Sequence, residues 1–160
     1  MRDITLSHLN KAFDGKPVLR DFSAVFPAGK MTAVMGQSGI GKTTLLRILL
    51  GLEKKDSGSI TGTEGVRFSV VFQEDRLLEA LTPVGNIRLT APRCLESEIL
   101  RALLSDGEVL LLDEPFKGLD EETKGRVMDY TRRLAAGKTV ILVTHDEREA
   151  KAMGAQILKL

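Results

Sequence analysis

The 160-residue chain contains a single cysteine, Cys94, which excludes an internal disulfide framework and a cysteine-built zinc site. This scarcity is typical of proteins in a reducing compartment. The longest uninterrupted apolar runs, 109–112 and 140–143, have four residues, whereas a membrane-spanning helix needs about 20. Residues 1–15 carry charges throughout and have no apolar segment of the kind that a signal peptide requires. We therefore expect a soluble chain that acts at a membrane only through a partner.

The chain also lacks a strong charge of either sign, because 23 Lys and Arg residues are balanced by 22 Asp and Glu residues. A net charge of +1 argues against a broad basic surface for nucleic acid or anionic lipid, so we expect no nucleic-acid partner. Hydrophobic residues make up 42% of the chain and charged residues 28%, which excludes a disordered tail or a fibre. The length fits one domain, residues 1–160.

Short apolar segments alternate with helical ones along the chain. The predicted strands are residues 4–9, 18–26, 31–35, 66–72, 108–112, 138–143 and 157–160. The predicted helices are residues 42–50, 120–136 and 146–153, and the second should bury Val127, Thr131 and Leu134 on one face. Residues 57–59 and 61–65 are predicted to be turn-rich. This order predicts an α/β fold with a mostly parallel sheet, flanking helices and a small antiparallel β part at the N-terminus.

One segment matches the phosphate-binding loop pattern, in which two glycines with four residues between them are followed by Lys and Thr. The matching residues are Gly36, Gln37, Ser38, Gly39, Ile40, Gly41, Lys42 and Thr43, followed by Thr44. Glycines let successive backbone N–H groups converge on phosphate oxygens, and the start of a helix adds its positive dipole end. Lys42 should contact the β- and γ-phosphates, and the Thr43 hydroxyl should bind Mg²⁺. The sequence therefore predicts a fold of the P-loop NTPase type.

A second motif is the apolar strand that ends in Asp113, Glu114 and Pro115. A carboxylate at this strand end should lie beside the magnesium, which assigns Asp113 to the metal. Glu114 is then predicted to face the attacking water as a general base or a water-positioning group. Alone this motif is weak, since many strands end in solvated acids, but it gains weight beside the phosphate-binding loop.

Along nearly its whole length, the chain resembles the ATP-binding subunits of ABC transporters. The glycine loop resembles that family's Walker A motif and the strand before Glu114 its Walker B motif. Gln73 resembles the Q-loop glutamine, the segment ending in Asp120 resembles the D-loop, and the segment around His145 resembles the switch-histidine region. Phe13 falls where the family places an aromatic ring that stacks on adenine, usually a tyrosine.

The resemblance implies a motor subunit that couples binding and hydrolysis of Mg-ATP to transport through a membrane permease. It implies that Gln73 helps to place magnesium with Thr43 and Asp113, that Glu114, His145 and Gln73 serve hydrolysis, and that Asp120 lies near the nucleotide. It further implies a second ATP-binding subunit, identical or not, and a cytoplasmic location on the inner face of the cell membrane. Residues 72–78 are similar to those of importers for small anions.

The chain departs from the family in one motif, the Leu-Ser-Gly-Gly-Gln signature at the start of a helix in a helical subdomain. No Gly-Gly pair occurs anywhere in the sequence, and the 40 positions that separate Gln73 from Asp113 are too few for that subdomain. The join falls near Ile99. Three explanations fit this pattern: a natural or engineered deletion, a non-transporting relative, or a real polypeptide with further residues that this sequence omits.

Two other classes of protein remain open. One is a soluble ABC-type ATPase that works on DNA or ribosomes, against which the neutral charge and the lack of long heptad repeats count. The other is a small P-loop kinase, which would need an acceptor-binding lid. The middle of the chain shows no obvious basic or aromatic cluster for such a lid.

Overall fold

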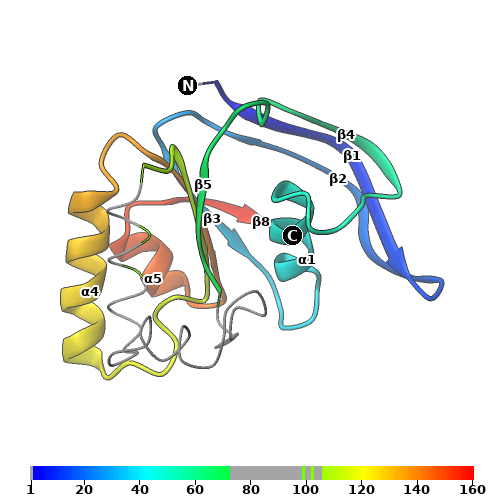
Figure 1. The fold of residues 1–160 in the computed structure, drawn as a ribbon. Coiled ribbons are helices and arrows are strands. Elements are labelled where there is room, and N and C mark those ends of the chain that lie inside the picture. Colours follow the sequence, from blue (N-terminus) through cyan, green and yellow to red (C-terminus); the bar gives the residue numbers. More distant parts are fainter. Residues whose placement is uncertain (1, 73–98, 100–101, 103–105) are drawn as a thin grey trace, which may run out of the picture.

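The computed structural model describes residues 2–72, 99, 102 and 106–160 (Figure 1). The described elements, in chain order, are β1 (Ile4–Phe13), β2 (Lys16–Phe26), β3 (Met31–Met35), α1 (Lys42–Leu49), β4 (Ser57–Thr61), β5 (Phe68–Val71), β6 (Val109–Asp113), α4 (Glu121–Leu134), β7 (Thr139–Thr144), α5 (Glu147–Ala152) and β8 (Gln156–Lys159). None of the helices in these described ranges is long and apolar enough to cross a membrane.

The larger sheet has five strands in the order β5-β6-β7-β3-β8, and every neighbouring pair is parallel. Its central strands β6, β7 and β3 are apolar and almost wholly buried, as expected for strands covered on both faces. The predicted parallel α/β sheet with flanking helices is confirmed. Because parallel strands share one carboxyl edge, the loops that follow β3, β6 and β7 lie at the same edge of the sheet.

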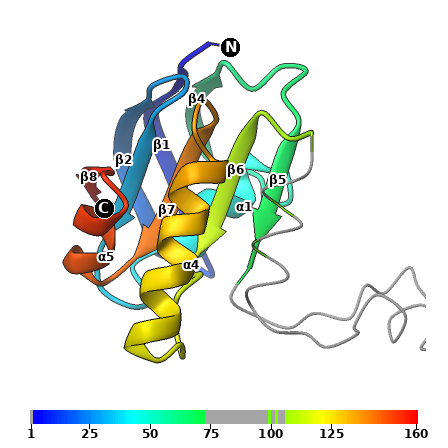
Figure 2. The same cartoon turned by 90° about the vertical axis from the view of Figure 1, so that its left-hand side faces the viewer.

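Each central strand contributes alternate side chains to two separate cores. Leu111 of β6 packs into the core between the sheet and α1, whereas Leu110 and Leu112 face the core beneath α4 and α5. Figure 1 shows α1 between the five-stranded sheet and the smaller sheet, and Figure 2 shows α4 crossing the outer face of β6 and β7. Helix α1 is therefore packed on two sides, which holds the loop at its N-terminal end in place.

The smaller sheet is antiparallel, with strand order β2-β1-β4, and confirms the predicted antiparallel part. Strands β1 and β2 are longer than predicted and meet at a two-residue turn. The turn residues, Asp14 (φ 49°) and Gly15 (φ 75°), both have positive φ, as tight hairpins with right-handed twist require. The structure corrects the prediction for residues 57–59, which form the strand β4 rather than a turn. This segment, Ser-Gly-Ser-Ile-Thr, has no alternating apolar pattern, because it is a mostly exposed edge strand.

Helix α4 buries a narrower face than predicted. Val127 and Thr131 are buried, and the Thr131 hydroxyl donates a 2.8 Å hydrogen bond to the Val127 carbonyl. Leu134 is 39% exposed, so its predicted place in the core is wrong. Ala135, the residue after the helix, is buried in its place and turns the chain toward β7.

Candidate functional site

The phosphate-binding loop joins the end of β3 to the start of α1 and folds around the amine of Lys42. This side chain is only 7% exposed, and its Nζ donates hydrogen bonds of 2.8 Å to the carbonyl of Gly36 and 2.9 Å to that of Gln37. The two carbonyls tie the ammonium to the loop. The structure thus places a positive charge directly beside the exposed residues Ser38 and Gly39.

The first turn of α1 has no side chain that caps it. Its N-cap residue is Gly41, and no acidic residue lies in the first turn. The other two helices in the described part of the chain are each capped by an aspartate, Asp120 for α4 and Asp146 for α5. Uncapped N–H groups at a helix start attract an anion, so α1 is the described helix whose N-terminus is open to one.

Gly41 allows the loop to lie close to strand β2. A Cβ atom at this position would come within 2.6 Å of a Val18 side-chain methyl and 3.0 Å of the Val18 carbonyl oxygen. The residue also has φ of 113°, a conformation that side chains other than glycine's rarely adopt. Glycine is therefore required here both by the backbone and by the close contact.

Thr43 and Asp113 come from different elements and meet at the carboxyl edge of the sheet. The Thr43 hydroxyl donates a 2.8 Å hydrogen bond to the Asp113 carboxylate, which is 4% exposed. Burial raises the pKa of Asp113, and the hydrogen bond from Thr43 opposes this shift without cancelling it. The folded chain thus holds a carboxyl group whose negative charge is costly unless a cation is present.

Glu114 lies next to Asp113 with an uncommon backbone conformation, a positive φ of 46°. Its amide donates a 2.9 Å hydrogen bond to the carbonyl of Val143 in β7. One carboxylate oxygen lies 3.4 Å from Nδ1 of His145, and the other lies 3.4 Å from Nζ of Lys117. Glu114 and His145, which the resemblance assigns to hydrolysis, are therefore in contact, with the imidazole 61% exposed and the carboxylate 12% exposed.

A cavity of about 240 Å³ lies beside the loop and is lined by Asp113 and Glu114, but not by His145 or Lys117. Its lining residues are Phe13, Val18, Ser38, Gly39, Gly41, Lys42, Thr43, Thr44, Asp113 and Glu114. The lining thus combines the aromatic ring of Phe13, residues of the phosphate-binding loop, and the carboxylates of Asp113 and Glu114. It can hold a ligand that combines a flat ring with a chain of phosphates.

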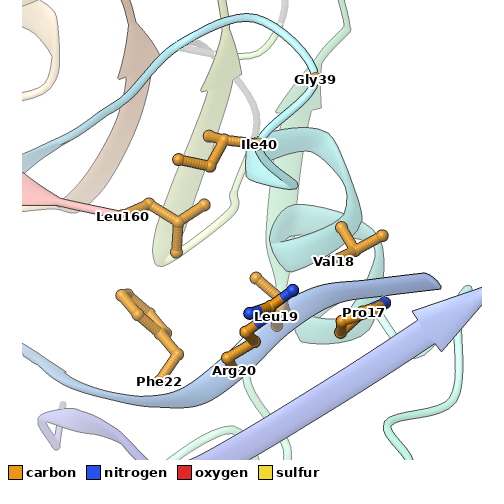
Figure 3. Close-up of a pocket in the computed structure, with 8 residues that line it drawn as sticks. All are labelled: Pro17, Val18, Leu19, Arg20, Phe22, Gly39, Ile40 and Leu160. Carbon is orange, nitrogen blue, oxygen red and sulfur yellow. The ribbon is translucent and has the colours of Figure 1, made fainter.

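A second hollow of about 380 Å³ lies on the other side of the loop (Figure 3). Figure 3 shows Ile40 of the loop facing Leu160, with Val18 and Phe22 of β2 nearby. Arg20 is the single charged residue among the described residues that line it. This hollow lacks Lys42 and both carboxylates, so it offers no comparable phosphate site.

The structure brings most of the predicted site residues to the cavity, but Gly36, Gln37, Ile40, Asp120 and His145 do not line it. Asp120 lies at the start of α4, where its carboxylate accepts a 3.0 Å hydrogen bond from the Thr123 amide, and it does not line the cavity. Gln73 lies outside the described residues. Val18, which lines the cavity, and Lys117, which contacts Glu114, were not predicted as site residues. Val18 carries no chemical motif, and Lys117 is one of many surface lysines in the sequence, so only their spatial neighbours identify them.

The donor groups at the cavity fit a magnesium ion. The described residues contain no cluster of three or more His, Cys, Asp or Glu side chains that could hold a metal alone. Mg²⁺ is commonly bound by one or two carboxylates together with phosphate oxygens and water, and it prefers oxygen ligands. The Thr43 hydroxyl and the Asp113 carboxylate supply two such oxygens at the wall of the cavity.

Replacing Asp113 with asparagine is expected to stabilise the nucleotide-free chain at pH 7. The raised pKa means that the folded state loses stability as the pH rises above the ordinary aspartate value, and asparagine removes that cost. The amide oxygen can still accept the Thr43 hydrogen bond. We expect a melting temperature higher by about 2–4 °C. The difference from the unaltered chain should shrink as the pH is lowered toward about 4. Mg-nucleotide should no longer raise the melting temperature of the Asp113→Asn variant. A nucleotide-free variant that melts below the unaltered chain at pH 7 would contradict this expectation.

Replacing Asp120 with alanine is expected to lower the melting temperature by about 2–4 °C at pH 7, because α4 loses its cap. The hydrogen bond from the Thr123 amide lowers the pKa of Asp120. The stability that the Asp120 carboxylate contributes is therefore fully present above the ordinary aspartate pKa. It is lost as the pH falls through the lowered pKa of Asp120 in the folded chain. Asp120→Asn keeps an acceptor oxygen and should retain the melting temperature. An equal loss in both variants would exclude the capping role.

Comparison with known proteins gives a consistent result. A family model described as ABC transporter matches residues 19–97. The aliphatic sulfonates import ATP-binding protein SsuB 1 of Paracoccus denitrificans is 34% identical, and the match covers 98% of this chain and 78% of that protein. The SsuB protein of Delftia acidovorans is 35% identical, with 98% of this chain and 79% of that protein covered.

Among solved structures, a bacterial Atm1-family ABC exporter with ATP bound has the same fold. It matches 99% of this chain with a TM-score of 0.78, at 20% sequence identity, while this chain spans 37% of the exporter chain. At that identity the likeness concerns the fold alone. The sequence relatives are closer and extend over nearly the whole chain, so this chain belongs to the family of ABC transporter ATP-binding proteins.

Proposed function

We propose that the chain binds Mg-ATP in the 240 Å³ cavity and uses it to drive uptake of a small organic anion through a membrane permease. The single observation that carries the binding part is the Thr43–Asp113 contact at the uncapped start of α1, with the Lys42 ammonium beside it. One helix start, one cation and one hydroxyl–carboxylate pair together match a triphosphate with its magnesium.

The predicted site residues have separate roles in this proposal. Lys42 and the amides of the loop hold the phosphates, while Thr43, Asp113 and Gln73 hold the magnesium. Bound magnesium neutralises phosphate charge and orients the chain of phosphates. Phe13 stacks on the base, for which its 42% exposure leaves a free surface.

Hydrolysis involves Glu114 and His145. Glu114 is proposed to accept a proton from the attacking water, and its contacts with His145 and Lys117 hold the carboxylate in position. His145, which is mostly exposed, is proposed to contact the γ-phosphate. Asp120 is proposed to act near the nucleotide of a second subunit, in addition to capping α4.

The proposed partners are a permease and a second ATP-binding subunit, at the cytoplasmic face of the membrane. The support comes from the relatives in Paracoccus and Delftia, whose names describe ATP-binding proteins for import of aliphatic sulfonates. Residues 72–78 are similar in sequence to those of importers for small anions, and sulfonates are anions of this kind. Residues 73–78 lie outside the described residues.

We further infer that the chain lacks a helical subdomain near residue 99. The alignment with the Paracoccus protein extends over 192 positions, while 98% of 160 residues is about 157. About 35 positions of that relative, the difference between 192 and 157, therefore have no counterpart in this chain. Ile99 and Ala102, which lie at the proposed join and just after it, are both buried in the core beneath α4.

Two measurements test the proposal. Calorimetric titration of the 160-residue chain with Mg-ATP should give one saturable site per chain, and magnesium-free ATP should bind more weakly. Co-expression with the permease of an aliphatic sulfonate importer, the class of system that the relatives' names describe, should give a complex that purifies intact. Absence of nucleotide binding would contradict the proposal as a whole, whereas binding without a permease complex would favour the soluble ATPase class.

A further inference from the structure

Lys11 does not line the cavity, but it contacts the ring of Phe13, which does. Lys11 and Phe13 lie two residues apart on β1, so their side chains share one face of the strand. Nζ of Lys11 lies 4.8 Å from the centroid of the Phe13 ring, within the range of a cation–π contact. Phe13 lines the cavity and Lys11 does not, so the ammonium contacts the ring from outside the cavity.

Two carboxylates hold this ammonium in place. Nζ of Lys11 lies 2.8 Å from Oε1 of Glu53 and 3.4 Å from Oδ1 of Asp56, and the lysine side chain is 10% exposed. The Glu53 carboxylate raises the pKa of Lys11 above its ordinary value by accepting its hydrogen bond, and Lys11 lowers the pKa of Glu53. The lysine is therefore charged throughout the physiological pH range.

The two carboxylates are themselves fixed to the strand and to the helix. The second Asp56 oxygen accepts a 2.7 Å hydrogen bond from the Ala12 amide, and the Asp56 amide donates to the Asn10 carbonyl at 2.9 Å. The Glu53 amide donates to the carbonyl of Arg47 in α1 at 3.2 Å. The lysine thus connects the end of α1, whose start forms the phosphate site, to the strand that carries the ring.

We propose that Lys11 is a positioning residue for the nucleotide base, because its ammonium, held by Glu53 and Asp56, fixes the Phe13 ring and leaves the opposite ring face open for stacking. This inference rests on the proposed function. A half-exposed phenylalanine without this contact samples several rotamers, and ordering it on binding costs entropy. A cation on one face also draws electron density from the ring, which favours an electron-rich base on the other face.

A purely structural role for Lys11 predicts a different result. If the lysine only neutralises Glu53 and Asp56, its replacement would affect stability but would not distinguish ligands with a base from ligands without one. Tripolyphosphate has the phosphates of ATP and no base, so it separates the two roles. The decisive quantity is the ratio of the two dissociation constants.

The test measures Mg-ATP and Mg-tripolyphosphate binding to the full chain by calorimetry. Lys11→Met is expected to weaken Mg-ATP binding about two- to fivefold and to leave tripolyphosphate binding unchanged. Lys11→Arg should restore the ATP affinity, since a guanidinium can make the same contacts. Lys30→Met, at an exposed lysine before β3, is the matched control and should change neither. If Lys11→Met does not fold, Glu53→Gln provides the test and should weaken ATP in the same direction.

The Phe13→Ala background completes the test. There Lys11→Met should have no further effect on ATP binding, because the ring through which it acts is gone. Three results would overturn this inference and leave the proposed function intact. Lys11→Met could weaken ATP binding equally with Phe13 and with Ala at that position, it could weaken tripolyphosphate binding as much as ATP binding, or it could leave ATP binding unchanged when Phe13 is present. If neither ligand binds the unaltered chain, both the proposed function and this inference are overturned.

Discussion

Replacing Lys42 with alanine is expected to weaken Mg-ATP binding at least about 100-fold in a calorimetric titration. The ammonium is the one buried cation among the described residues that line the cavity, and it is already desolvated there. Hydrogen bonds to charged groups contribute about 1.5–3 kcal/mol each, so the loss of two phosphate contacts removes about 3–6 kcal/mol. Such a loss corresponds to more than two orders of magnitude in affinity.

A matched control separates this effect from a general change of charge. Lys30 precedes β3 and is exposed, so Lys30→Ala removes the same charge away from the cavity. It should leave the dissociation constant unchanged. The Lys42→Ala chain must retain its cooperative melting transition, because the carbonyls of Gly36 and Gln37 lose a donor in this variant. Affinity that falls equally in both variants would show that the site is elsewhere.

The chain alone is expected to bind ATP but to release phosphate barely above the rate without protein. The family resemblance implies that a signature serine and backbone amides from a second subunit stabilise the γ-phosphate, and this sequence has no Gly-Gly pair that could form them. Comparable groups that a second subunit or protein supplies increase the rate of phosphoryl transfer by about 10³–10⁵-fold. The measurement is multiple-turnover phosphate release at saturating Mg-ATP.

Glu114 provides the check on this expectation. Glu114→Gln should remove any residual turnover, whereas Glu122→Gln, an exposed glutamate of α4, should not change it. Rapid turnover in the unaltered chain that disappears in Glu114→Gln would contradict the expectation. Such a result would mean that the cavity supplies its own transition-state stabilisation, without a signature motif from a second subunit.

The parallel sheet was predictable from sequence because its strands carry a strong local signal. Strands β6 and β7 are short apolar runs buried on both faces, and such runs have few other stable placements. The sequence assigned Thr43 and Asp113 to one magnesium site, and the two side chains lie together because α1 begins and β6 ends at the same edge of the sheet. The resemblance to ABC transporter ATP-binding subunits is confirmed by the relatives.

Features that depend on distant neighbours could not be predicted in this way. Strand β4 has almost no apolar residue, and it is a strand because β1 offers it a free edge. Leu134 fits the helical period, but α4 ends there and the chain turns away from its face. Val18 and Lys11 belong to strands whose position beside the loop and beside Phe13 is set by tertiary packing, which periodicity does not encode.

The central claim is that the amides at the start of α1 enclose a chain of phosphates. Amide chemical shifts of the ¹⁵N-labelled chain, recorded during titration with Mg-tripolyphosphate and then Mg-ATP, test it most directly. The account predicts that both ligands cause their largest shifts at Gly39, Gly41, Lys42 and Thr43, and that only ATP also shifts Phe13. Unchanged signals from these loop residues, with shifts elsewhere or none at all, would contradict it.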